Sequence, residues 1–62
     1  MTAVAQWKPC EVLHDGRWLP GMLERWRRDP QGWRAFVRWS EGPGLTHITW
    51  EWADNLRPRQ SE

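Results

Sequence analysis

The sequence predicts an all-β domain, folded as a small antiparallel barrel of five strands. Apolar and polar residues alternate at the period of two that a half-buried strand requires. Turn signals separate the alternating segments at Asp15-Gly16, Asp29-Pro30-Gln31-Gly32 and Gly42-Pro43-Gly44, a spacing typical of an antiparallel meander. The chain has 62 residues, seven of them tryptophan, so it has room for one small domain, and most of the tryptophans are needed for its core.

The first two strands are expected at Cys10–His14 and Arg17–Arg28. In the first, Cys10, Val12 and His14 alternate with Glu11 and Leu13. Pro20-Gly21 interrupts the second, and a proline inside a strand requires an edge position or a bulge. We therefore expect the second strand to bend strongly.

The third strand, Trp33–Ser40, has the clearest alternation in the sequence. One face carries Trp33, Ala35, Val37 and Trp39, and the opposite face carries Arg34, Phe36 and Arg38. A fourth strand is expected at Leu45–Trp50. Because apolar residues form one face of the third strand, that face is expected to line the core.

The C-terminal part is expected to form a 3₁₀ turn at residues 51–55 and a short fifth strand at Leu56–Pro58. Residues 1–6 and 59–62 are expected to be disordered ends that flank a barrel of residues 7–58. Five short and bent antiparallel strands protect their edges by curling into a barrel. The expected layout is SH3-like.

Several segments resemble the Tudor and Agenet domains, which are SH3-like barrels. The resemblance spans about residues 6–58 and rests on Gln6-Trp7-Lys8, Cys10-Glu11-Val12, Asp15-Gly16-Arg17-Trp18-Leu19-Pro20-Gly21, Ala35-Phe36-Val37-Arg38-Trp39 and Asn55-Leu56-Arg57-Pro58. Tudor-type domains bind methylated lysine or arginine in a cage of aromatic rings. The resemblance implies that Trp18 and Trp39 occupy two cage positions, while the other cage positions fall near Leu13 or His14 and near Gly42 and Gly44.

A weaker resemblance links the segments Trp18–Trp26, Gln31–Trp33 and Thr46–Thr49 to the type II plasmid-borne dihydrofolate reductases. Those enzymes are also SH3-like barrels, and they form a catalytic pore as tetramers. Of their Val-Gln-Ile-Tyr stretch, this chain matches only Ile48. The chain is therefore expected not to be an enzyme.

The favoured function is a non-enzymatic binding module for a protein or peptide. Its ligand is expected at an aromatic rim formed by Trp18, Trp39 and Trp50, with Glu41 as the charge partner of a cationic side chain. The rim hypothesis requires that surplus aromatic area be exposed at one end of the barrel.

An alternative is nucleic-acid binding through a face that combines arginines with an aromatic ring. The residues concerned are Arg25, Arg27, Arg28, Arg34, Phe36 and Arg38. Arginines bind phosphates and aromatic rings stack on bases, so this composition suits a nucleic acid. A purely structural adaptor subunit is the third hypothesis.

Other chemistry has little support in the sequence. The single cysteine, Cys10, cannot form a disulfide within the chain, and His14 and His47 lack a third zinc ligand, so neither a metal nor a cofactor is expected. No apolar run is long enough to span a membrane and no signal peptide is evident, which favours a cytoplasmic protein that does not bind membranes. The net charge of +1 gives little long-range attraction for a charged partner, and the oligomeric state stays open.

Overall fold

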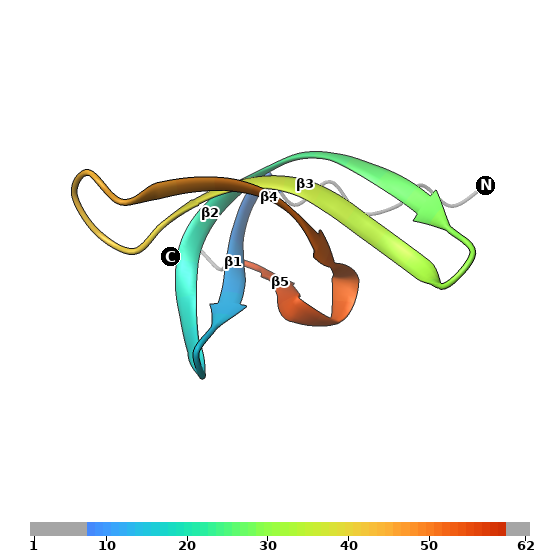
Figure 1. Ribbon diagram of the computed structural model, residues 1–62, viewed down its shortest axis with the longest axis horizontal. Helices are drawn as coiled ribbons and strands as arrows, with labels where there is room; N and C mark the ends of the chain where they lie inside the picture. Colours follow the sequence, from blue (N-terminus) through green and yellow to red (C-terminus); the bar gives the residue numbers. More distant parts are fainter. Residues whose placement is uncertain (1–7, 60–62) are drawn as a thin grey trace.

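The computed structural model describes residues 8–59, which form a single antiparallel sheet of five strands and one 3₁₀ turn (Figure 1). The elements are β1 Pro9–His14, β2 Arg17–Asp29, β3 Gly32–Ser40, β4 Thr46–Trp52, the 3₁₀ turn η1 Ala53–Asn55 and β5 Leu56–Pro58. The predicted all-β class, the five antiparallel strands and the 3₁₀ turn before the last strand are confirmed.

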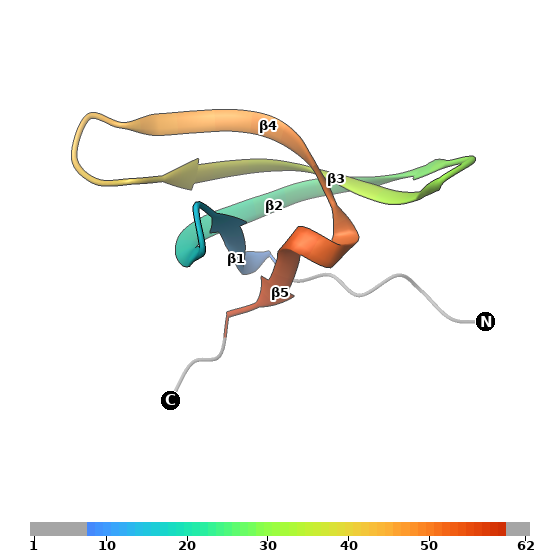
Figure 2. The ribbon, with the colours of Figure 1, turned by 60° about the horizontal axis from the view of Figure 1, so that its bottom comes forward.

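The strands follow the order β4-β3-β2-β1-β5, so β4 and β5 form the two edges of an open sheet. Figure 2 shows β1 and β5 lying beneath the layer formed by β2, β3 and β4. The long strand β2 connects the two parts, because its beginning pairs with β1 and its end pairs only with β3. The sheet therefore folds over itself without joining its edges through a ladder.

Two features of β2 accompany its bend, which is visible in Figure 1. At Gly21 the chain passes so close to β3 that an added Cβ atom would lie 2.9 Å from the carbonyl oxygen of Arg38. Beyond it, Leu23 pairs with Val37 but Arg25 pairs with Phe36, which leaves Glu24 as the extra residue of a β-bulge. The predicted bend of the second strand is confirmed.

The core lies on the inner side of the bent sheet. Its buried residues are Cys10, Val12, Leu19, Leu23, Ala35, Val37, Trp39 and Leu56, with Trp26 packed against them. Burial raises the pKa of the Cys10 thiol to about 11, and the neighbouring Glu11 carboxylate adds to this shift. Cys10 is therefore a core residue in its neutral form.

Four expected strand boundaries differ from the structure by one residue, since β1 begins at Pro9, β2 ends at Asp29, β3 begins at Gly32 and β4 begins at Thr46. Two further boundaries differ by two residues. β4 continues to Trp52, two residues beyond its predicted end, because Glu51 and Trp52 pair with Ala35 and Arg34 of the long strand β3. The 3₁₀ turn is correspondingly shorter than predicted and begins at Ala53.

The structure describes only part of the chain ends that were expected to be disordered. Residues 1–6, Trp7 and residues 60–62 lie outside them. Arg59, which is described, donates its backbone N–H to the Pro9 carbonyl at 3.1 Å. Within residues 8–59 no helix has the length and apolar character of a membrane-spanning segment.

Candidate functional site

The side of β2, β3 and β4 that points away from the core carries arginines and aromatic rings. We call it the outer face. Its residues alternate with the buried ones in β3 and pair across the strands, and they comprise Arg25, Arg27, Arg34, Phe36, Arg38, Ile48, Trp50 and Trp52. The β-bulge at Glu24 decides this composition, because it moves Arg25 and Arg27 to the outer face and Trp26 toward the core.

At the centre of the outer face two arginines lie against two aromatic rings. The Phe36 and Trp50 ring centroids lie 5.0 Å apart. The guanidinium carbon of Arg25 lies 5.3 Å from the Phe36 centroid and 5.6 Å from that of Trp50, and the guanidinium carbon of Arg27 lies 5.7 Å from Trp50. These distances are those of cation–π contacts, which hold the guanidinium groups against the sheet.

A second stack lies at the end of the same face. The guanidinium carbon of Arg34 lies 4.2 Å from the Trp52 ring, and Arg34 Nε lies 3.2 Å from Asp29 Oδ2. Asp29 therefore offsets one of the positive charges, and Arg25, Arg27 and Arg38 are exposed on the remaining surface.

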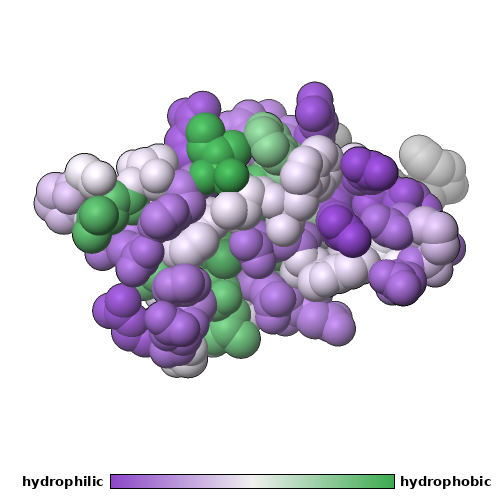
Figure 3. All heavy atoms as spheres, in the orientation of Figure 1, coloured by the Kyte–Doolittle hydropathy of each residue, from purple (hydrophilic) through white to green (hydrophobic). Residues whose placement is uncertain are grey.

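The structure assembles most of the predicted arginine group but leaves out Arg28. Arg28 pairs with Trp33, and its guanidinium carbon lies 5.5 Å from that ring, on the side of the strand opposite Arg27. Arg38 lies in one cross-strand row with Met22 and Ile48, which are 44% and 54% exposed. In Figure 3 a small group of hydrophobic spheres interrupts the hydrophilic surface above the crossing of β2, β3 and β4.

The predicted aromatic rim is separated into three places. Trp39 is 5% exposed and belongs to the core, because it alternates in phase with Ala35 and Val37. Trp50 lies on the outer face, and Trp18 stacks against the guanidinium of Arg57 at 4.2 Å. The three tryptophans therefore do not form one exposed platform.

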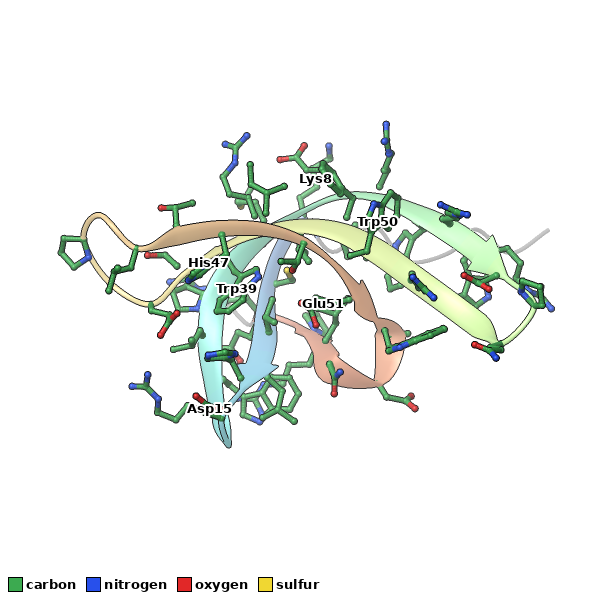
Figure 4. The ribbon with its side chains drawn as sticks, viewed as in Figure 1. Lys8, Asp15, Trp39, His47, Trp50 and Glu51 are labelled. Atoms are coloured by element: carbon green, nitrogen blue, oxygen red, sulfur yellow. The ribbon has the colours of Figure 1, made fainter. Side chains whose placement is uncertain are left out.

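Glu41 is the one predicted rim residue that lies near Trp39. Its carboxylate lies close to two histidines whose rings pack against the Trp39 indole. The ring centroids of His14 and His47 lie 4.9 Å and 4.6 Å from that of Trp39, and Figure 4 shows His47 beside Trp39 and Trp50 away from both. Glu41 Oε2 lies 2.7 Å from His47 Nε2 and 4.0 Å from His14 Nε2. The carboxylate thus pairs with an imidazole.

The indole of Trp39 is also held from the side of β4. Trp39 Nε1 donates a hydrogen bond to Thr49 Oγ1 at 2.9 Å, and Thr49 Oγ1 donates to Glu51 Oε2 at 2.6 Å. These hydrogen bonds satisfy the one polar atom of the buried indole, so the position of Trp39 is explained by packing and hydrogen bonding.

Residues 8–59 line two cavities to which the outer face also contributes residues. The larger, of about 390 Å³, lies between the β2–β3 turn and η1 and is lined by Gln31, Gly32, Trp33, Trp52, Ala53 and Asp54. The smaller, of about 240 Å³, is lined by Pro20, Gly21, Met22, Arg38, Trp39, Ser40, Thr46 and Arg59. Among residues 8–59, no three His, Cys, Asp or Glu side chains gather in a way that could hold a metal ion.

Sequence reasoning did not assign Trp52 to the outer face. The signal was present, because the alternation of Thr46, Ile48 and Trp50 extends to Trp52 without interruption. The prediction stopped the fourth strand at Trp50, because the 3₁₀ turn was expected at residues 51–55.

No protein family, no curated protein and no solved structure matches this chain.

Proposed function

We propose that the protein binds single-stranded nucleic acid through the outer face. The observation that carries the proposal is the stack of Arg25 with Phe36 and Trp50, at 5.3 and 5.6 Å, beside the exposed Arg27. Guanidinium groups neutralise phosphates, and exposed ring faces stack on bases.

The proposal specifies a single strand because stacking on a protein ring requires an unstacked base. A base pair inside a duplex presents only its edges, which the half-buried rings of Phe36 and Trp50 do not match. With a net charge of +1, the affinity derives from local contacts on this face and not from the charge of the whole molecule.

As part of this proposal we take the bent sheet to be an open SH3-like barrel of Tudor type. It is supported by the strand order, by the bend of β2 and by the 3₁₀ turn that precedes β5. The aromatic cage that the Tudor resemblance implied has no support from Trp39, which is buried.

The test is the salt dependence of binding to a labelled heptauridylate, measured by fluorescence anisotropy. Each phosphate that the protein neutralises contributes a slope of about −0.7 to a plot of log affinity against log salt. Arg27→Ala should flatten the slope by about that amount. Arg17→Ala, which removes an exposed charge from the first residue of β2, is the matched control and should leave the slope nearly unchanged.

Trp50→Ala separates stacking from charge. It should weaken binding about tenfold with little change in slope, because stacking releases few counterions. Absence of binding at low salt, or equal slopes for Arg27→Ala and Arg17→Ala, would contradict the proposed function.

A protein or peptide ligand is the second candidate. It is favoured by the exposed side chains of Met22 and Ile48 next to the apolar cavity of about 240 Å³, since exposed apolar area of this kind marks contact surfaces. In that case Ile48→Ser would abolish co-purification of a protein partner and leave binding of heptauridylate unchanged. An adaptor role would use the same row of residues in a larger assembly.

A further inference from the structure

The cavity of about 390 Å³ lies at the end of the outer face and has a different composition from it. Two indoles, Trp33 and Trp52, form part of its wall, and Gln31 and Asp54 contribute polar groups. Trp52 also stacks on Arg34, so the cavity and the outer face share one residue. Trp33 alternates in phase with the buried Ala35 and Val37, so the cavity lies where the core side of β3 and the outer face meet, and Trp52 is its point of contact with a strand on that face.

The charges around the cavity restrict what it can hold. The guanidinium carbons of Arg28 and Arg34 lie 5.5 Å from Trp33 and 4.2 Å from Trp52. Asp29 Oδ2 offsets the charge of Arg34 at 3.2 Å from its Nε, and the Asp54 carboxylate lines the cavity itself, so charges of both signs lie near the indoles. A neutral planar ring with hydrogen-bond donors suits this lining, because the ring stacks on indole and its donors bind the carboxylate, while the attached phosphates pair with the arginines of the outer face.

We propose that this cavity binds a guanine base of the strand held by the outer face; the inference rests on the proposed function. Asp54 supplies the selectivity, since an ionised carboxylate only accepts hydrogen bonds. Guanine has two adjacent donors, N1–H and the N2 amino group, that can bind both oxygens of one carboxylate. Adenine has one amino group beside an acceptor nitrogen, and uracil has one N–H between two carbonyls, so each satisfies the carboxylate less well.

Gln31 complements this pattern. Its side-chain amide can donate a hydrogen bond to the O6 carbonyl of guanine, and in the opposite orientation it can accept one from the amino group of adenine, so the discrimination rests on Asp54. The cavity is thus expected to discriminate between the two purines through the Watson–Crick edge of the base, which is accessible only in a single strand.

The test compares heptauridylate with heptanucleotides that carry one central guanine or one central adenine. Guanine should raise the affinity about tenfold over heptauridylate, as expected for one bidentate contact, and adenine should raise it by about twofold or less. Asp54→Asn should reduce the guanine effect, taken as the ratio of the affinity for the guanine-containing strand to that for heptauridylate with the same variant, to about twofold. Asp15→Asn makes the same change in charge at an exposed turn on another hairpin and should retain the full effect.

The outcomes distinguish the inference from the proposed function. Salt-dependent binding of heptauridylate without a guanine preference would overturn the inference alone. Absence of binding by all three strands would overturn the proposed function as well. Guanosine monophosphate should bind at least about tenfold more weakly than the guanine-containing strand, because it lacks the contacts to the outer face; equal affinity would overturn the assignment to a strand.

Discussion

Replacing Thr49 by valine tests the hydrogen-bonded chain that holds the core tryptophan. Valine has nearly the shape of threonine, so Thr49→Val removes the hydroxyl group without creating a cavity. The hydroxyl accepts from Trp39 Nε1 at 2.9 Å and donates to Glu51 Oε2 at 2.6 Å. Because Trp39 is only 5% exposed, its N–H would be left buried without a partner.

An unsatisfied buried donor costs about 1–3 kcal/mol, and the half-buried Glu51 can replace its lost bond with water. We therefore expect the free energy of unfolding to fall by about 2 kcal/mol. In a domain of this size each 1 kcal/mol lowers the melting temperature by about 4–8 °C, so the expected decrease is about 8–16 °C.

The measurement is thermal unfolding followed by circular dichroism at constant pH and protein concentration. Thr46→Val is the matched control, because Thr46 lies on the same strand, is exposed, and gains the same preference of valine for strands. The control should change the free energy by no more than about 0.5 kcal/mol. Melting temperatures of the two variants within about 3 °C of each other would refute the stabilising role assigned to the hydrogen bonds of Thr49.

Three further predictions concern the core. Gly21→Ala should destabilise the fold by about 1–3 kcal/mol in urea unfolding, because the new methyl group would lie 2.9 Å from a carbonyl oxygen of β3 that cannot move independently; unchanged stability would contradict the close approach. Val37→Asp should abolish the dispersion of amide proton shifts, since an unpaired charge would replace a fully buried side chain. Cys10 should resist thiol reagents at pH 8 until the protein unfolds. Because its pKa rises from 9.0 to about 11, the folded state retains a proton that the unfolded chain releases, and stability should decline as the pH rises from 9 to 11.

The local pattern of residues was sufficient to predict the strands and the core. Ala35 and Val37 are fully buried, as the alternation in the third strand indicated, because a period of two places every second side chain on the same side of a sheet. The Pro20-Gly21 interruption likewise predicted the bend of β2. These features depend on residues close together in the sequence.

The prediction of an aromatic rim was wrong because it depended on how strands far apart in the sequence pair with each other. Trp39 and Trp50 lie eleven residues apart, and whether they share a surface depends on the pairing of β3 with β4, which places Trp50 opposite Phe36. Trp39 is buried because a core this small needs the apolar area of an aromatic ring.

What the sequence by itself determined is the all-β class, the strand-by-strand alternation and the turns, because these follow from local backbone preferences and the pleat. Only the tertiary structure decided which face each arginine occupies, since the bulge at Glu24 reverses the phase of β2 and a single extra residue leaves no clear mark in the sequence. The same holds for the cavity between Trp33 and Trp52: it exists because the chain turns back at η1 and brings a segment some twenty residues distant against the β2–β3 turn.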